Sequence, residues 1–517
     1  MELERNNIHM SKILKNEIST FYVSHEAGLA EADDMIDNII HYHEIVSVDN
    51  TSIRNNQLIV NGTVSFGMMY YTNDSDMAKG TEGEIPFEET IKLNALDENC
   101  NADVSLVVLS SSVKLIDSKS YIYKVQIMAN ITIEKMEDLE AVSEIQRENV
   151  MVRHSDLDTL CVVADKSDTF RVSERLSVPS GKPAIQKIIW QDVKIKTINT
   201  KMLDGMIHIG GELKVFLIYI PEDDGMPQQW MDTMINFGGT IDTAEAREDL
   251  VSYINTVLHN VDIEAEMNQD NETRDIVISA LLKLNIKIYE ERQMNVLEDV
   301  YAPDANLVPE IEEKKYQRLL VKNESRTKNV VKLDIDQSKG HILQICSSDA
   351  EVKIDNIIVG DSGLKAVGKI KVCIIYISSD DAKPLCCQCK ETDFEHRIDA
   401  DGIMPEDKYY MNWRVEQVSA NMISTNQVEI KSVVALETIV FRTEKKAFIS
   451  QIEEHPMDME KINAAPMIKG YVVQKGDTLW KLAKENYTTI DSIMKVNELT
   501  SEQIKPGQRL LIIKSCQ

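Results

Sequence analysis

The sequence contains three copies of one pattern, 60-VNGTVSFGMMYYT-72, 209-IGGELKVFLIYIP-221 and 366-AVGKIKVCIIYIS-378. When the copies are aligned on a glycine, a tyrosine follows eight residues later in each copy. A phenylalanine follows 25, 26 and 26 residues after the same glycines. The aligned triplets are Gly62, Gly211 and Gly368; Tyr70, Tyr219 and Tyr376; and Phe87, Phe237 and Phe394. A spacing that is kept three times indicates an internal repeat, which is a strong constraint on the architecture.

Apolar and polar residues alternate within each copy, which is typical of a β-strand with one buried face. A second alternating stretch closes each repeat, at 121–133, 276–288 and 428–440, and a polar turn precedes each of these stretches. No amphipathic stretch of helix length separates the strands, so a parallel α/β sheet is not expected. About five or six strands per repeat, each with one apolar face, predict a mainly β protein of three tandem antiparallel β-sandwich-like repeats.

The repeats and the stretches between them give the expected domain boundaries. The β repeats are expected at 15–140, 165–295 and 320–445, and the first is the most diverged. The acidic connectors at 134–149 and 298–315 fit either short helices or loops. Residues 446–468 are mostly polar and lack a pattern, which predicts a linker to a C-terminal module at 469–514.

The composition excludes several classes of protein. The 517 residues include 56 basic and 85 acidic ones, which gives a net charge of −29. This balance argues against nucleic-acid binding, because contacts with the phosphate backbone need basic patches. The first twenty residues lack the apolar core of a signal peptide, and no apolar run is long enough to span a bilayer. Eight unevenly spaced cysteines do not form the framework of a secreted domain, so we expect a reducing cytoplasm and no membrane insertion.

Motifs of catalysis and metal binding are missing or incomplete. The sequence has no GxxxxGK[ST], GxGxxG, GxSxG or HExxH motif, and its carboxylates are scattered over turns and polar faces. Cys386-Cys387-x-Cys389 lacks the second cysteine pair of a zinc site, which favours a polar hairpin loop with thiols. His41-x-His43-Glu44 puts two imidazoles on one strand face without a third ligand, which favours a surface strand. No catalytic residue, metal or cofactor is therefore predicted.

The C-terminal module predicts the order β-α-α-β in about 45 residues. Thr478 is suited to cap the first helix, and Pro506-Gly507 turns the chain into the last strand. The run Tyr471-x-Val473, Gly476-Asp477-Thr478-Leu479, Leu482-Ala483 and Pro506-Gly507-x-x-Leu510-x-Ile512 resembles the LysM domain in order and spacing. The resemblance implies a groove between two turns, which in many LysM domains holds N-acetylglucosamine-containing glycan. The residues implied for this groove are Gly476, Asp477, Thr478, Leu479, Ile504, Lys505, Pro506 and Gly507.

Two apolar residues of the module favour a protein partner instead of a glycan. Trp480 lies on the first helix beside the core positions but off the core face, and Ile468 precedes the first strand with no evident core to join. Because an exposed tryptophan is a favoured anchor of protein interfaces, we predict that Trp480 and Ile468 bind a partner. The alternative is that Trp480 covers its own domain, since so small a module is hard to stabilise.

Three β repeats followed by one LysM module resemble the SPOCS-domain spore coat morphogenetic proteins of spore-forming bacteria. The second repeat carries this resemblance, with VSERLSVPSGKPAIQKIIW before GGELKVFLIYIP. The resemblance implies a non-enzymatic scaffold of the mother-cell cytoplasm, located at the forespore surface and in the spore coat. Its LysM domain is implied to bind SpoIVA, the ATPase of the coat basement layer, so that the coat encases the forespore. The alternative is a protein that binds peptidoglycan of the spore cortex or cell envelope.

Overall fold

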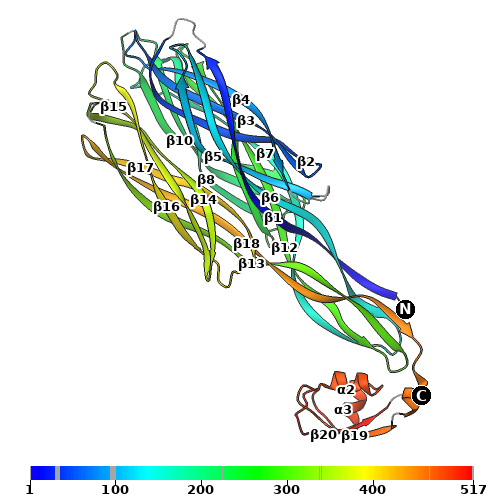
Figure 1. Ribbon diagram of the computed structural model, residues 1–517. Helices are drawn as coiled ribbons and strands as arrows, with labels where there is room; N and C mark the ends of the chain where they lie inside the picture. The colour runs from blue at the N-terminus through cyan, green and yellow to red at the C-terminus, as the bar shows by residue number, and fades with distance from the viewer. Residues whose placement is uncertain are drawn as a thin grey trace.

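The computed structural model (Figure 1) describes residues 2–29, 35–93, 100–223, 225–336, 338, 340–464 and 466–514. The strands of the first repeat are β1 (Glu2–Gly28), β2 (Ile36–Arg54), β3 (Gln57–Thr72), β4 (Lys79–Lys92), β5 (Cys100–Leu115) and β6 (Ser120–Gln146). Those of the second are β7 (Met151–Ser177), β8 (Ile185–Leu203), β9 (Met206–Pro221), β10 (Gln229–Asp242), β11 (Val251–Met267) and β12 (Thr273–Tyr301). Those of the third are β13 (Asn306–Asp334), β14 (Ile342–Gly360), β15 (Gly363–Ser378), β16 (Leu385–Asp399), β17 (Lys408–Ser424) and β18 (Gln427–His455).

Short helices occur only near the C-terminus of the described chain. The elements there are α1 (Met459–Ala464), β19 (Ile468–Val472), α2 (Leu479–Glu485), α3 (Ile490–Val496) and β20 (Arg509–Ile513). The order of the last four elements is the predicted β-α-α-β. None of the helices in the described ranges has the length and apolar character that crossing a bilayer requires.

Each repeat is a sandwich of two three-stranded antiparallel sheets. We call the sheets β2-β3-β4, β8-β9-β10 and β14-β15-β16 the inner sheets of the three repeats. We call the sheets β1-β6-β5, β7-β12-β11 and β13-β18-β17 the outer sheets. The alternating apolar residues of the central strands fill the space between the two sheets. In the second repeat Leu213, Val215, Leu217 and Tyr219 are completely buried. The prediction of three antiparallel sandwich-like repeats is therefore confirmed.

The repeated glycine and phenylalanine form one cross-strand pair in every repeat. Gly62 lies opposite Phe87, Gly211 opposite Phe237, and Gly368 opposite Phe394. A Cβ atom on any of these glycines would come within 2.3 Å of a carbonyl oxygen of the neighbouring strand. That strand has a bulge close to this point, which brings its backbone toward the glycine. The glycine therefore recurs in all three repeats because the backbone of the neighbouring strand comes too close for a residue with a Cβ atom.

The central strands of the outer sheets and their partners continue far beyond the sandwiches. The pairs β1–β6, β7–β12 and β13–β18 extend as three two-stranded ribbons that twist together into a stalk (Figure 1). Apolar residues from all three ribbons form the core of this stalk. They are Ile8, Met10, Leu139, Ala141, Leu157, Cys161, Met294, Val296, Tyr316 and Phe448.

The stalk contradicts several expected boundaries. Most of 134–149 and 298–315 is strand, not helix or loop, and the repeats extend beyond 15–140, 165–295 and 320–445. The expected linker 446–468 begins with ten residues of β18, in which Phe448, Ile449 and Ile452 are buried, and it then contains α1. These stretches look polar because each ribbon buries only one narrow face. The residues that cover this face come from the other repeats.

The three sandwiches pack side by side at the wide end of the molecule (Figure 1). Their inner sheets share an apolar core, to which Tyr71 contributes from the first repeat, Trp190 and Phe216 from the second, and Ile375 from the third. The Tyr71 hydroxyl accepts a hydrogen bond from the Leu385 amide at 2.8 Å and lies 3.3 Å from the Leu385 carbonyl oxygen. Repeats that are consecutive in the sequence are therefore clustered in space and not strung end to end.

A buried ion pair joins the repeats where the sandwiches meet the stalk. The Lys287 Nζ atom lies 2.9 Å from both carboxylate oxygens of Glu134 and 3.2 Å from Asp165. The hydroxyls of Ser11 and Tyr410 donate to the Glu134 carboxylate. Burial alone would lower the pKa of Lys287, but the carboxylates of Glu134 and Asp165 outweigh burial and raise it. The pair fixes the first and second repeats to each other, and Tyr410 adds the third.

Candidate binding site

The C-terminal module has a compact core of its own. Leu479, Leu482, Ala483, Ile493, Leu510 and Ile512 are buried together between the two helices and the two-stranded sheet. The Thr478 side chain accepts a hydrogen bond from the Lys481 amide, and Thr489 caps α3 in the same way. These caps satisfy amide groups that the first turn of a helix leaves without a partner. Capping explains why two helices as short as these begin where the sequence places them.

The two turns implied for a glycan groove lie side by side. The Gly507 amide donates to the Val473 carbonyl oxygen at 2.8 Å, and this bond brings the turn at 505–508 next to the turn at 474–477. Gly476 and Gly507 have positive φ values of 94° and 87°, which favour glycine. Asp477 accepts hydrogen bonds from the Gln474 amide and the Tyr471 hydroxyl, and these bonds lower the pKa of its carboxyl.

The residues predicted for the groove differ in their exposure. Gly476, Thr478, Lys505, Pro506 and Gly507 are exposed, whereas Asp477 and Ile504 are partly buried. Leu479 is buried in the core of the module, so its side chain supports the turn from below and is not available to a ligand. The exposed part of the groove therefore combines the backbone of two glycines with the side chains of Thr478, Lys505 and Pro506, and Pro506 is its one apolar side chain.

An apolar surface covers the outer face of the two-stranded sheet. Residues that lie directly opposite each other in an antiparallel sheet point to the same side, and here the pairs are Ile468–Ile513, Gly470–Leu511 and Val472–Arg509. We call Ile468, Gly470, Val472, Leu511 and Ile513 the outer LysM face. Ile468, Val472 and Leu511 are 59%, 48% and 42% exposed. The predicted partner-binding residue Ile468 thus belongs to a surface of several apolar side chains.

Trp480 is not the exposed residue that the sequence predicts. Its indole Nε1 donates to the Asp299 carboxylate at 2.7 Å, and its ring packs edge-on against Tyr301 at a centroid distance of 4.9 Å. The Arg153 guanidinium lies 5.5 Å from the ring, and Lys484 donates to Asp299 at 2.6 Å. Asp299 and Tyr301 belong to the end of β12, so Trp480 holds the module against the stalk.

This contact separates the two predicted partner-binding residues. Helix α2, which carries Trp480, faces the stalk, and the sheet of β19 and β20 lies on the far side of the module (Figure 1). Sequence reasoning misses Asp299 and Tyr301, because both lie in the acidic stretch 298–315, 181 and 179 residues before Trp480. The pairing of β12 with β7 places both residues at the end of the stalk, where they contact the module. The sequence alone does not show this contact.

Replacing Asp299 with alanine is expected to release the module from the stalk. The substitution removes the carboxylate that accepts hydrogen bonds from Trp480 and Lys484. A hydrogen bond to a charged group contributes about 1.5–3 kcal/mol to stability. Hydrogen exchange of the amides in residues 479–486 measures the release, with faster exchange expected. Asp304→Ala, which breaks an exposed ion pair with Arg147 at the same end of the stalk, serves as the control. Equal exchange in both variants would contradict the assigned contact.

The same contact predicts a response to pH. Burial alone would raise the pKa of Asp299, but the hydrogen bonds from Lys484 and Trp480 outweigh burial and lower it. A carboxyl with a lowered pKa stabilises the folded contact at pH values above its ordinary pKa of about 4. The contact is therefore expected to persist at neutral pH and to weaken only as the pH falls below about 4.

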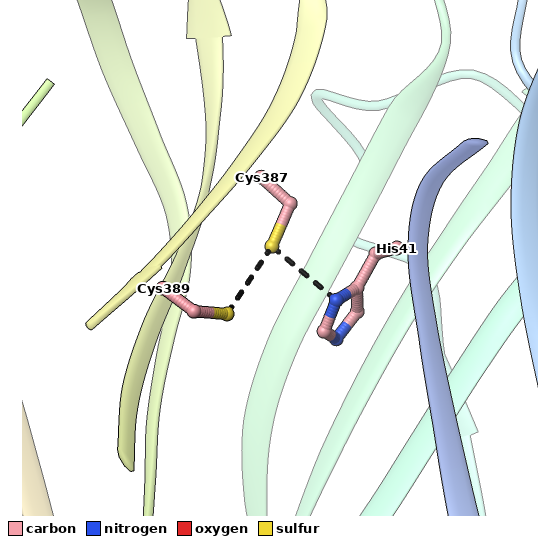
Figure 2. Close-up of side chains that lie close together, drawn as sticks. All are labelled: His41, Cys387 and Cys389. Atoms are coloured by element: carbon pink, nitrogen blue, oxygen red, sulfur yellow. Dashed lines mark hydrogen bonds between the residues drawn. The ribbon is translucent and has the colours of Figure 1, made fainter. Parts of the chain in front are cut away.

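A second group of reactive side chains lies between the first and third repeats (Figure 2). The Cys387 Sγ atom lies 3.3 Å from His41 Nδ1 and 3.9 Å from Cys389 Sγ. Cys389 forms a disulfide with Cys373 on the neighbouring strand. Burial, with a smaller contribution from His43, lowers the pKa of His41 to about 3.

This arrangement corrects three expectations. Cys386, Cys387 and Cys389 lie in strand β16 and not in a hairpin loop, and Cys386 and Cys387 are buried. His41 and His43 pack against Trp190 of the second repeat at centroid distances of 5.2 and 4.5 Å, so β2 is not a surface strand here. The disulfide was not expected from the spacing of the cysteines, because its two residues are brought together by the pairing of β15 with β16.

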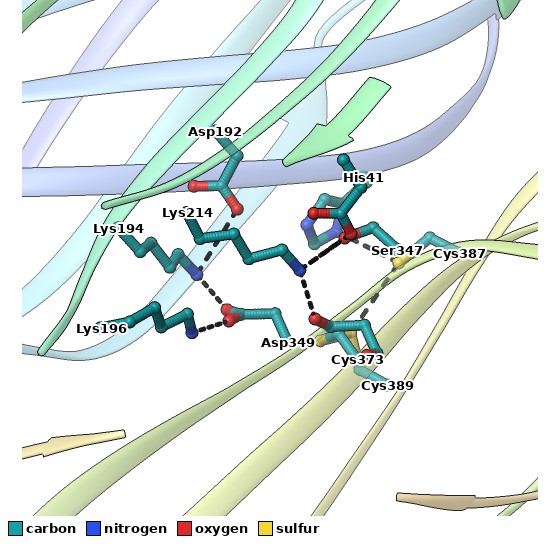
Figure 3. A network of polar contacts seen from close by, with 12 residues as sticks. His41, Asp192, Lys194, Lys196, Lys214, Ser347, Asp349, Cys373, Cys387 and Cys389 are labelled. Atoms are coloured by element: carbon teal, nitrogen blue, oxygen red, sulfur yellow. Dashed lines mark hydrogen bonds and ion pairs between the residues drawn. A yellow bond between two sulfur atoms is a disulfide. The ribbon is translucent and has the colours of Figure 1, made fainter. Parts of the chain in front are cut away.

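Charged residues line a cavity of about 410 Å³ next to this cluster. Figure 3 shows the polar contacts among them. Lys196 lies 3.0 Å from the Asp349 carboxylate, and Lys194 forms ion pairs with Asp349 and Asp192. Burial alone would raise the pKa of Asp349, but the two lysines outweigh burial and hold it well below its ordinary value. Lys214 donates to Ser347 at 2.8 Å. This network connects the second repeat to the third.

A second cavity, of about 480 Å³, contains converging carboxylates that the sequence did not predict. Asp103, Glu134 and Asp165 line it together with Lys287. Burial raises the pKa of Asp103. Lys287 of the second repeat pairs with both Glu134 of the first repeat and Asp165 of the adjacent strand β7, so Glu134 carries the contact between repeats. The geometry of these ion pairs is that of a structural contact.

Comparisons with known proteins agree with this division of the chain. Residues 35–116, 184–266 and 341–423 match the family described as SipL, SPOCS domain, and residues 471–512 match the LysM domain. Each SPOCS match covers the three strands of an inner sheet and the next strand in the chain, which belongs to the outer sheet. The first match, for example, runs from β2 to β5. The long strands that build the stalk lie outside the matched residues.

Similarity to curated proteins is confined to short segments. The probable endopeptidases p60 of Listeria seeligeri and Listeria monocytogenes are each 48% identical over 52 residues, which is 10% of this chain and 10% and 11% of theirs. The uncharacterized protein YkzQ of Bacillus subtilis is 43% identical over 42 residues, which is 8% of this chain and 56% of that protein. The chain thus spans about a tenth of the length of the p60 proteins. No solved structure matches it.

The family follows from the order of the matches. Each of the three SPOCS matches covers four of the six strands of one β-sandwich, and the LysM match coincides with the module that Trp480 holds against the stalk. Both are binding domains without catalytic function. The chain therefore belongs to the SipL-like proteins, with three SPOCS domains and a C-terminal LysM domain.

Proposed function

We propose that this spore-coat-related LysM protein is a non-enzymatic scaffold that binds SpoIVA, the ATPase of the coat basement layer, and helps the coat encase the forespore. The observation that carries the proposal is the outer LysM face, on which Ile468, Val472 and Leu511 are exposed together. Exposed apolar side chains on neighbouring strands are typical of a surface that another protein covers. Their place on the far side of the module from the stalk leaves room for a large partner.

The role proposed for Trp480 is different from that of Ile468. Trp480 binds the partner only if the module leaves the stalk, because Asp299 and Tyr301 cover it. Ile468 needs no such release. We therefore place the first contact with SpoIVA on the outer LysM face and treat Trp480 as a residue that positions the module.

Replacing Ile468 with arginine is expected to reduce capture of SpoIVA at least tenfold. A charge on the apolar surface that the partner covers removes an anchor and leaves an ionised group to be desolvated, which corresponds to a loss of about 2 kcal/mol or more. The measurement is the amount of purified SpoIVA retained by the immobilised full-length protein. Ser501→Arg adds the same charge at an exposed position that lies outside the outer LysM face.

The comparison with Ser501→Arg decides the outcome. Capture that is lost in Ile468→Arg and kept in Ser501→Arg supports the proposal. Capture that is unchanged in Ile468→Arg contradicts it, provided that both variants show the circular dichroism of the natural protein.

The second candidate function is binding of peptidoglycan, which suits the LysM groove between its two turns. The exposed backbone at Gly476 and the exposed Lys505 side chain supply groups for hydrogen bonds to an N-acetylated sugar. Retention of the protein on purified peptidoglycan tests this function. Gly476→Val, which puts a branched side chain on a backbone with positive φ, is expected to abolish retention while Ile468→Arg leaves it intact.

We place the protein in the mother-cell cytoplasm at the forespore surface, in agreement with its family and its proposed partner. No enzymatic activity is proposed. Of the three carboxylates of the 480 Å³ cavity, Glu134 and Asp165 form ion pairs with Lys287, and the cavity is lined by strands of the first and second repeats.

A further inference from the structure

One imidazole and three sulfur atoms meet where the first SPOCS domain contacts the third. His41 belongs to β2, Cys373 to β15, and Cys387 and Cys389 to β16. The ligand atoms of His41, Cys387 and Cys389 all lie within 4.8 Å of one another. Cys373 lies directly opposite Cys389 in the strand pair, so its sulfur belongs to the same group. We propose that these four residues bind a zinc ion in the reduced protein and thereby link the two domains.

Two of the distances between ligand atoms already suit a tetrahedral ion, and reduction of the disulfide would free the sulfurs of Cys373 and Cys389 to separate. Zinc binds sulfur at about 2.3 Å and imidazole nitrogen at about 2.0–2.1 Å, which places two sulfur ligands about 3.8 Å apart and a sulfur and a nitrogen about 3.6 Å apart. The observed separations are 3.9 Å between the sulfurs of Cys387 and Cys389 and 3.3 Å between Cys387 Sγ and His41 Nδ1 (Figure 2). Each agrees with the expected value within about 0.3 Å.

The donor set selects the metal. Three thiolates and one imidazole form the closed four-ligand shell that structural zinc sites use, and they exclude magnesium and calcium, which prefer oxygen. The bound group carries one net negative charge. Lys371 lines the adjacent cavity together with His41 and Cys373.

Zinc binding and the disulfide are alternative states of the same atoms. A dithiol reductant transfers two electrons to the Cys373–Cys389 disulfide: the S–S bond breaks, each sulfur gains a proton, and the two thiols of the reductant become a disulfide. Zinc then binds the three cysteines, which release three protons to solvent. Oxidation of Cys373 and Cys389 reverses this step and removes two of the four ligands.

The site differs from an ordinary zinc finger because its ligands come from distant parts of the chain. His41 and Cys387 are 346 residues apart. The ion therefore holds two domains together and does not fold one small domain. Release of zinc by oxidation would loosen the contact between β2 and β16 at the wide end of the molecule.

The test uses the full-length protein, reduced with a phosphine, freed of metal and dialysed against zinc. We expect about one zinc ion per chain by elemental analysis. Cobalt in place of zinc is expected to give the thiolate-to-cobalt charge-transfer absorption and the visible bands of a tetrahedral site. Cys387→Ser and His41→Ala are each expected to lower zinc affinity at least tenfold. Cys161→Ser, which changes a buried cysteine of the stalk, is the matched control and is expected to retain full affinity.

A second measurement does not depend on the folding of a variant. Zinc is expected to protect Cys373, Cys387 and Cys389 of the natural sequence from alkylation in the reduced protein, and treatment with a thiol oxidant is expected to release the ion. The proposal is overturned if the reduced protein binds no zinc. It is overturned equally if cobalt shows an octahedral spectrum without charge transfer, or if Cys161→Ser loses as much affinity as Cys387→Ser.

Discussion

Replacing Lys287 with methionine is expected to destabilise the protein by about 3–5 kcal/mol, because it leaves a buried charge without its partner. The side chains of Lys287 and Glu134 are 7% and 3% exposed, so water cannot replace the lost ammonium group. The carboxylate of Asp165 lies nearby and adds repulsion. The midpoint of urea unfolding measures the loss, and the contact between the first and second repeats is expected to fail first.

Two further variants separate the charge from the packing. Adding Glu134→Gln to Lys287→Met removes the unpaired charge and keeps groups for Ser11 and Tyr410 to bind, so we expect it to recover at least about half of the lost stability. Lys365→Met breaks an exposed ion pair with Glu395 and is expected to cost less than about 1 kcal/mol. If Lys287→Met costs no more than Lys365→Met, the buried pair does not have the proposed structural role.

The strands that face their own core were predictable from the sequence, whereas those that face another repeat were not. In β9 the residues Leu213, Val215, Leu217 and Tyr219 are buried because the partner sheet lies within the same repeat. On the other face of β9, Phe216 and Ile218 are buried in the core that the three repeats share. In the stalk part of β6 the buried residues Leu139 and Ala141 stand among acidic ones. Their burial depends on residues such as Tyr316 and Phe448 of the third repeat. A pattern that spans three repeats cannot be read from one of them.

The same distinction applies to the candidate sites. The turns of the LysM domain lie close in sequence, and their capping residues and glycines were predicted together. The partner of Trp480 is 181 residues away, and the partner of Cys387 is 346 residues away. Each half of such a contact looks incomplete on its own: a lone tryptophan off the core face, or a histidine pair without a third ligand. Only the packing of the domains shows that the incomplete halves meet.

Replacing Gly211 with alanine is expected to destabilise the second SPOCS domain by about 3 kcal/mol or more. The added Cβ would lie 2.0 Å from the Thr197 carbonyl oxygen and 2.9 Å from the Phe237 ring. The oxygen belongs to the backbone of β8 at its bulge, so it cannot move away without breaking the pairing of β8 with β9. Overpacking of this kind usually costs about 1–3 kcal/mol, and a clash with backbone belongs at the upper end or above.

The neighbouring glycine provides the matched control for this prediction. A Cβ on Gly210 would meet its nearest atom, the Phe237 carbonyl oxygen, at 3.4 Å, so Gly210→Ala is expected to change stability by less than about 1 kcal/mol. The two variants add the same methyl group to adjacent residues of one strand. Thermal unfolding followed by circular dichroism compares them directly. If they unfold together, the Gly–Phe pair of each repeat marks no close backbone approach, and the spacing kept three times in the sequence needs another cause.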